Sequence, residues 1–135
     1  MLTILADHNV EAHLDALVNI WTSAEWLELW QMVDCKVCKF ASVGLRSTTP
    51  DSELWSFCQT NQMLLLTGNR NADGPDSLEM TSLQRNTALS LPVLTFGDPD
   101  RVLRDRLYAE AAASRILDYV VSIKNFRGAR RLYVP

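Results

Sequence analysis

Side chains that could bind a hard metal ion occur in three short segments of the sequence. Asp7 and Asn9 follow one apolar run, and Asp51 follows a proline. A polar segment from Asn69 to Glu79 follows a second apolar run. Mg²⁺ and Mn²⁺ prefer carboxylate and amide oxygens and commonly complete their shells with water and phosphate oxygens. These segments therefore predict a Mg²⁺ or Mn²⁺ site at which metal-activated water hydrolyses a phosphodiester bond.

Short apolar runs and helical spacings alternate along the chain, as in α/β proteins. Strands are expected over residues 2–6, 37–43, 63–66 and 91–96, and residues 130–134 could be a terminal strand or a basic tail. Helices are expected over residues 10–21, 24–32 (or as an extension of the first), 50–58, 77–89, and from residue 99 past residue 121. The prediction is one domain, residues 1–135, with a mainly parallel sheet of four or five strands in an α/β/α sandwich.

The last expected helix carries two apolar stripes. One stripe contains Leu103, Leu107, Ala111, Leu117 and Val121, and the other contains Val102, Ile116 and Val120. Both faces need covering, and we expect the second stripe to contact the sheet or to form a dimer surface.

Ligands of parallel α/β sheets bind beyond the carboxyl ends of the strands. This rule points to Asp7, to the loop after Leu66 and to Asp98, although Asp98 is also expected to be the N-cap of a helix that begins at Pro99.

Three segments, in order, resemble the motif series of one known family. Residues 5–9 (LADHN), 50–55 (PDSELW) and 64–71 (LLLTGNRN) are similar to the DUF5615 branch of PIN-like domains, which resemble toxin-type ribonucleases. The resemblance implies an Mg²⁺- or Mn²⁺-dependent endoribonuclease in which Asp7 and Asp51 are catalytic metal ligands and Asn69 takes the position of a third acid. It also implies RNA as substrate, a cognate antitoxin-like partner and a homodimer.

Asn69 and Asn71 depart from the family pattern, which has acidic residues at both positions. A neutral carbonyl holds a cation less tightly than a carboxylate does. The nearby acids could replace the lost charge as metal ligands; they are Asp73, Asp76 and Glu79. Arg70 could contact a substrate phosphate or neutralise the acids. The alternative function is a PIN-like scaffold that has lost catalysis and binds a protein or nucleic-acid partner.

Each candidate also has a purely structural interpretation. Asp7 could end a strand by binding backbone donors, and Asp51 could be an acid at a helix N-terminus. Turn and cap roles are favoured for the three later acids, Asp73, Asp76 and Glu79. His8 and His13 have no evident catalytic partner, and we interpret them as surface or loop residues.

A phosphotransfer domain of receiver or haloacid-dehalogenase type also begins with an Asp after its first strand. It fits less well, because His8 and Asn9 follow Asp7 where a second carboxylate is needed and Lys124 comes too late for the sheet lysine.

The charge distribution and the cysteines give further information about the surface and the thiols of this protein. Residues 1–98 carry 5 basic and 12 acidic side chains, whereas residues 99–135 carry 8 basic and 4 acidic ones. This asymmetry is compatible with an acidic metal pocket beside a basic surface.

Cys35, Cys38 and Cys58 lack the partners of a zinc site and are expected to be unreactive thiols. Cys35 and Cys38 are expected on opposite faces of a strand. Without an apolar stretch long enough for a signal or a membrane span, the protein is expected in the cytoplasm.

Overall fold

A five-stranded, all-parallel sheet forms the centre of the computed structural model, which describes residues 2–68 and 77–135. The strands are β1 (Leu2–Ala6), β2 (Cys35–Cys38), β3 (Met63–Thr67), β4 (Val93–Phe96) and β5 (Arg131–Val134). They are arranged in the order β2-β1-β3-β4-β5, and every neighbouring pair is parallel. The predicted α/β class and mainly parallel sheet are confirmed, and residues 131–134 form a strand.

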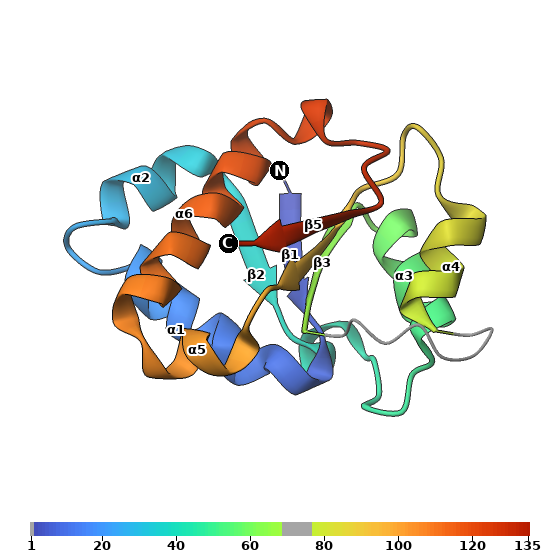
Figure 1. Cartoon of the computed structure of the whole chain (residues 1–135), viewed down its shortest axis with the longest axis horizontal. Helices are drawn as coiled ribbons and strands as arrows, with labels where there is room; N and C mark the ends of the chain where they lie inside the picture. Colours follow the sequence, from blue (N-terminus) through green and yellow to red (C-terminus); the bar gives the residue numbers. More distant parts are fainter. Residues whose placement is uncertain (1, 69–76) are drawn as a thin grey trace.

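Helices cover both faces of the sheet (Figure 1). One layer contains α1 (Glu11–Trp21), α2 (Leu27–Val33), α5 (Pro99–Arg104) and α6 (Arg106–Val121). The other contains α3 (Asp51–Thr60) and α4 (Leu78–Arg85). Among the described residues, three short 3-10 helices join these elements: η1 (His8–Val10), η2 (Phe40–Val43) and η3 (Ile123–Asn125).

Alternation along the strands divides the buried apolar side chains between two clusters. Ile4 and Ala6 of β1 belong to the cluster under α1 and α6, whereas Leu5 belongs to the cluster under α3. Successive side chains of a strand point to opposite faces, so the even-numbered residues of β1, β3 and β4 face one layer and the odd-numbered residues face the other. The cluster on the α1/α6 face is the larger one.

The second strand ends earlier than the sequence predicted. The expectation of a strand over residues 37–43 is wrong beyond Cys38, because the chain turns there into η2. The backbone N–H of Phe40 donates to Oε2 of Glu11 at 3.1 Å, and Nζ of Lys39 pairs with Asp15 at 2.8 Å. These contacts with α1 draw the segment away from the sheet edge.

The predicted last helix is two helices. Asp105 is extended (φ −125°, ψ 107°), and its Oδ1 accepts hydrogen bonds from the backbone N–H groups of Leu107 at 3.1 Å and Tyr108 at 3.3 Å. Asp105 is therefore the N-cap of α6, and the helix that begins at Pro99 ends at Arg104.

The two stripes of α5 and α6 have different environments. Val102 and Val120 are buried against the sheet, and sheet contact was one of the two roles expected for their stripe. In the other stripe Leu117 is buried, but Leu103, Leu107 and Val121 are exposed, so the expectation that both faces are covered is wrong for these three. The expected helix over residues 77–89 is also shorter, because the chain becomes extended at Asn86.

The cysteines are free thiols in protected positions. Cys35 packs against the α1/α6 cluster and Cys38 against the α3 cluster, which confirms their predicted opposite orientation. Burial raises the pKa of Cys35 and of Cys58 to about 12 and raises the pKa of Cys38, so all three stay protonated at neutral pH. Within residues 2–68 and 77–135, none of the helices is long and apolar enough to span a bilayer.

Candidate functional site

Three polar side chains lie at one level on the α3/α4 face, where β1, β3 and β4 end. Thr67 of β3 is the register partner of Thr95 of β4, and Ala6 of β1 is the partner of Leu66. Asp7, which follows Ala6, therefore lies beside Thr67 in the same row. Thr67 and Thr95 are fully buried, and they are polar residues in strands that are otherwise mostly apolar. We call Asp7, Thr67 and Thr95 the polar row.

Asp7 is held by hydrogen bonds to both of its carboxylate oxygens. The Thr67 hydroxyl donates to Oδ2 at 2.8 Å, and the backbone N–H of His8 donates to Oδ1 at 2.7 Å. The backbone N–H of Asp7 donates to the carbonyl of Leu66 at 2.8 Å, which extends the pairing of β1 with β3 by one residue. These contacts fix the carboxylate on the α3/α4 side of the sheet.

The carboxylate of Asp7 lies in an environment that resists ionisation. Burial raises the pKa of Asp7 above its ordinary value of 3.8, and the negative charge of Asp51 raises it further. The hydrogen bonds from Thr67 and His8 oppose this rise without cancelling it. Two carboxylates from segments far apart in sequence thus lie within electrostatic range of each other.

Asp51 reaches the same region from the start of a helix. It is the first residue of α3, after Pro50, and its Oδ2 accepts a hydrogen bond from the backbone N–H of Leu78 at 3.3 Å. Leu78 is the first residue of α4, so Asp51 joins the N-terminal ends of two helices. A carboxylate is stabilised there by the positive ends of both helix dipoles.

An ion-pair cluster continues the polar row toward β5. Nη1 of Arg131 donates to Oγ1 of Thr95 at 2.6 Å, and Nη2 contacts Oε2 of Glu79 at 3.1 Å. Arg130 contacts the other Glu79 oxygen at 3.1 Å. The Arg131 side chain is only 9% exposed, so it is held in place by the sheet and α4.

The structure brings together some of the predicted site residues. Asp7 lies within electrostatic range of Asp51, whereas both oxygens of Glu79 contact arginines and Asn9 is exposed in η1. The remaining candidates lie outside the described residues: Asn69, Arg70, Asn71, Asp73 and Asp76. Their metal and phosphate roles stay predictions, as do those of Asp7, Asn9, Asp51 and Glu79. Asp98 is the N-cap of α5 and accepts from the N–H of Arg101 at 3.2 Å.

The histidine interpretation is correct for His8 and wrong for His13. His8 is exposed, and its ring centroid lies 6.1 Å from that of Phe40. His13 is buried in α1 with its ring centroid 5.6 Å from that of Phe96. Burial lowers the pKa of His13, and the nearby Pro99 carbonyl and Asp100 oppose this effect. His13 lies on the α1/α6 face of the sheet, opposite the polar row.

Sequence reasoning missed the two threonines and Arg131. A signal for the threonines was present, because Thr67 and Thr95 each stand two residues after an apolar residue that faces α3 and α4, namely Leu65 and Val93. Arg131 gave no such signal, since only the register of β4 with β5 places it beside Thr95.

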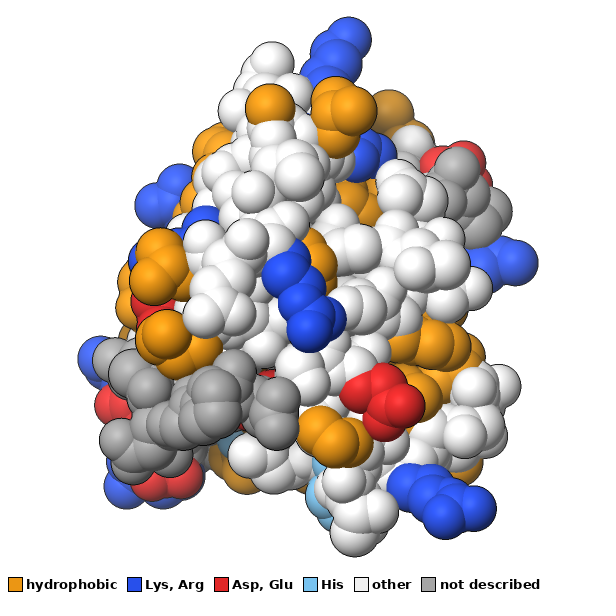
Figure 2. All heavy atoms as spheres, turned by 90° about the vertical axis from the view of Figure 1, so that its right-hand side faces the viewer, with side chains coloured by type: hydrophobic (Ala, Val, Ile, Leu, Met, Phe, Trp, Pro, Cys, Tyr) orange, Lys and Arg blue, Asp and Glu red, His pale blue; other side chains and the backbone are white. Residues whose placement is uncertain are grey.

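The carboxylates of this region suit a hard divalent cation. Asp7 and Asp51 offer carboxylate oxygens, and a bound cation would offset the burial of the Asp7 charge and its repulsion by Asp51. In the part of the chain that the structure describes, no group of three His, Cys, Asp or Glu side chains is arranged to hold a metal ion. Basic, acidic and apolar side chains are scattered over the α3/α4 side among polar and backbone atoms (Figure 2).

Comparison with known proteins adds no family to this description. The sequence matches no family model, and neither curated proteins nor solved structures show significant similarity to it. Functional interpretation therefore rests on the geometry of the site.

Proposed function

We propose that this chain is a divalent-metal-dependent ribonuclease of PIN-like type. The observation that carries the proposal is that Asp7, held by Thr67 at the carboxyl end of an all-parallel sheet, lies within electrostatic range of Asp51 at the start of α3. That edge is where ligands of such sheets bind, and paired carboxylates are the usual protein contribution to a Mg²⁺ or Mn²⁺ site.

Asp7 and Asp51 would hold the ion, with Asn9 near enough in sequence to Asp7 to add an amide oxygen. When bound, Mg²⁺ or Mn²⁺ supplies positive charge that activates water and offsets the charge of the scissile phosphate. Thr67 positions the Asp7 carboxylate through its hydroxyl, and Leu78 positions Asp51 through its backbone N–H. Both acids are thus held before any ligand arrives, which reduces the cost of ordering the site.

Arg131 would contribute at the other end of the site. Its guanidinium holds Thr95 and Glu79, so it fixes the positions of polar groups on β4 and α4. Arg130 is the more exposed member of the pair, with 35% of its side chain accessible, and is the better placed of the two to meet a phosphate. The site would then present carboxylates at one end and a guanidinium at the other.

The test is cleavage of end-labelled single-stranded and structured RNA by highly purified protein with Mn²⁺ or Mg²⁺. Wild-type protein is expected to cleave, and EDTA is expected to abolish cleavage. Asp7→Asn and Asp51→Asn are each expected to lower the rate by at least about 100-fold, because each removes a charge that would hold the ion.

Asp15→Asn is the matched control, since Asp15 is an acid of α1 that pairs with Lys39 at the surface. It should leave cleavage unchanged. Failure of the wild-type protein to cleave RNA with either ion would refute the proposal, and so would cleavage that persists in Asp7→Asn.

A PIN-like scaffold that binds a partner without catalysis is the second candidate. The observation that favours it is the pairing of Glu79 with Arg130 and Arg131, together with the absence, among the described residues, of a group of three His, Cys, Asp or Glu side chains that could hold a metal ion. It predicts Mn²⁺ affinity too weak for titration calorimetry, and RNA or protein binding that Asp7→Asn does not change.

A further inference from the structure

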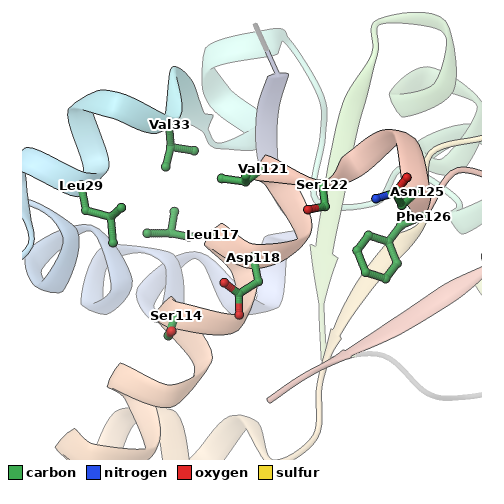
Figure 3. A pocket seen from close by; sticks show the side chains of 9 residues that line it. All are labelled: Leu29, Val33, Ser114, Leu117, Asp118, Val121, Ser122, Asn125 and Phe126. Carbon is green, nitrogen blue, oxygen red and sulfur yellow. The ribbon is translucent and has the colours of Figure 1, made fainter.

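The cavities of the surface differ in their place and in their lining. One lies between α2 and α6, has apolar side chains such as Leu29 and Val121 in its walls, and belongs to the layer opposite α3 (Figure 3). Another, of about 320 Å³, opens beside the start of α3 and combines charged, polar and apolar groups. The residues that line it are Gly44, Leu45, Arg46, Thr49 and Glu53. We call it the loop cavity.

The loop cavity lies next to an acid of the proposed ribonuclease site. Thr49 and Glu53 are each two residues from Asp51, so their Cα atoms lie at most about 7 Å from that of Asp51. The same segment reaches the loop after β1, since the ring centroids of Phe40 and His8 are 6.1 Å apart. A ligand in the cavity would therefore be a neighbour of a group bound at Asp51.

Local hydrogen bonds fix the walls of the loop cavity. The backbone N–H of Leu45 donates to the Phe40 carbonyl at 3.0 Å, and Gly44 ends η2 in the left-handed conformation at φ 75°. The backbone N–H of Arg46 donates to Oγ1 of Thr49 at 3.2 Å, and the backbone N–H of Thr49 donates to the Arg46 carbonyl at 3.0 Å. The backbone of the cavity is thus preformed, which lowers the cost of filling it.

Two side chains of opposite charge line the loop cavity without pairing. Within residues 2–68 and 77–135, the ion pairs involve neither Arg46 nor Glu53. Both side chains are exposed, so both charged groups are accessible to a ligand. A guanidinium presents a fork of N–H donors, and a carboxylate presents two acceptor oxygens. The cavity therefore suits a ligand that carries a pair of adjacent acceptors and a pair of adjacent donors.

Guanine is the RNA base that meets both requirements. Its O6 and N7 are adjacent acceptors, to which arginine binds in a bidentate manner. Its N1–H and N2–H are adjacent donors that match the two oxygens of a carboxylate. Adenine places the N6 donor beside the N7 acceptor, which suits an amide side chain, and cytosine and uracil each carry one donor group. These edges are accessible in single-stranded RNA.

We propose that the loop cavity binds a guanine base of single-stranded RNA, with Arg46 donating to O6 and N7 and Glu53 accepting from N1–H and N2–H. Binding there gives the ribonuclease a preference for cleavage beside guanine. This inference rests on the proposed function, because the ribonuclease site at Asp51 is what makes RNA the ligand.

The first experiment measures the binding of four fluorescein-labelled RNA heptamers to the intact protein by anisotropy in EDTA. Each heptamer is a run of uridines whose central base is G, A, C or U. The G heptamer is expected to bind at least about tenfold more tightly than the others, because guanine engages both charged groups. Equal affinity for the G and A heptamers would overturn the proposal. So would 5′-GMP that binds as tightly as the G heptamer, because the ligand would then be a free nucleotide.

Variants of the two charged residues test the location. Glu53→Gln places an N–H against the donors of guanine, and Arg46→Met removes the donor fork. Each should reduce the preference for the G over the A heptamer to less than about twofold. The matched controls are Glu28→Gln in α2 and Lys124→Met in η3, which make the same charge changes at exposed positions outside the cavity.

The ratio of the two affinities separates base recognition from a general effect of charge or folding. A general effect changes the affinity for both heptamers alike and leaves the ratio as it is, and both controls should do so. A preference for guanine that Arg46→Met and Glu53→Gln leave unchanged would place the base elsewhere and overturn the proposal.

The use of EDTA keeps this test separate from the test of the ribonuclease. Protein that prefers the G heptamer in EDTA but cleaves no RNA with Mn²⁺ or Mg²⁺ would refute the ribonuclease and support guanine recognition. Protein that cleaves RNA but binds the heptamers equally would refute guanine recognition alone. Where both hold, cleavage of an RNA of mixed sequence should concentrate beside guanine, and Glu53→Gln should spread it over the other bases. Cleavage that ignores guanine would overturn the proposal.

Discussion

The two faces of the sheet use the same strands differently. On the α1/α6 face, β1, β3 and β4 place apolar side chains up to their last residues, as Phe96 shows at the end of β4. On the α3/α4 face the apolar cluster stops earlier, and the last positions are polar, namely Thr67 and Thr95, followed by Asp7 beyond β1. Stability is therefore expected to come mainly from the first face, and chemistry from the carboxyl end of the second.

Phe96→Ala should give the largest loss of stability. Phe96 is fully buried in the α1/α6 cluster, so its truncation leaves a cavity and should lower the free energy of unfolding by about 3–5 kcal/mol. Urea denaturation measures the loss. Leu83→Ala, at a position 60% exposed on α4, is the control and should cost less than about 0.5 kcal/mol. Similar losses for the two variants would contradict the proposed division between the faces.

Thr95→Val should lower the free energy of unfolding by less, about 1–3 kcal/mol, because it removes a hydrogen bond. It removes the oxygen that accepts from Nη1 of Arg131 and leaves a largely buried guanidinium short of a partner. Thr95→Ser keeps the hydroxyl and should lose less. In an Arg131→Met background the cost of Thr95→Val should shrink. A cost independent of Arg131 would mean that packing, rather than the hydrogen bond, holds Thr95.

Asp7→Asn should increase stability by about 1 kcal/mol at pH 7 in EDTA, since functional acids are often held at the expense of stability. Burial and Asp51 raise the pKa of Asp7, so its ionised form destabilises the folded state. As pH rises above 3.8, the Asp7 carboxyl loses its proton in the unfolded chain before it does so in the folded protein. The gain should therefore shrink as pH falls toward 3.8, as thermal melts across pH would show.

The control for this gain is Asp15→Asn. Asp15 forms an exposed ion pair with Lys39, so its loss should not raise stability. If Asp7→Asn is destabilising at pH 7, its hydrogen bonds to Thr67 and His8 outweigh the electrostatic penalty, and the contrast between the faces is smaller than proposed.

His13→Leu should have the smallest effect, visible only in the pH dependence of stability. Burial lowers the pKa of His13 below 6.5, so the unfolded chain binds this proton more readily as the solution is acidified. Wild-type stability should therefore fall as pH drops below 6.5 and through the lower pKa of the folded state. His13→Leu should reduce that fall. An NMR titration midpoint for His13 at or above pH 6.5 would contradict this expectation.

The fold was largely predictable because its strands are short, continuous apolar runs. Residues 2–6 and 63–66 show this clearly, and a buried parallel strand needs apolar side chains on both faces. The end of β2 was not predictable, since Phe40 leaves the sheet to contact Glu11, which is distant in sequence. The break between α5 and α6 had a local signal that was overlooked: Asp105 is a strong capping residue.

The candidate site was predictable in part. Asp7 and Asp51 could be named from residue type and position, and their approach follows from where a strand ends and a helix begins. The partners of Glu79 could not, because they depend on how α4 lies against β5. Strand alternation could have revealed Thr67 and Thr95, but only together with the register of β3 and β4.

The stacked tryptophans have a spectroscopic consequence. Indole rings that lie parallel at 4.6 Å share their electronic transitions, so Trp21 and Trp30 form a coupled chromophore between α1 and α2. Release of α2 from the body of the molecule would separate the rings and change the tryptophan circular dichroism and fluorescence. The protein thus contains a natural optical label for the position of α2, readable without dyes.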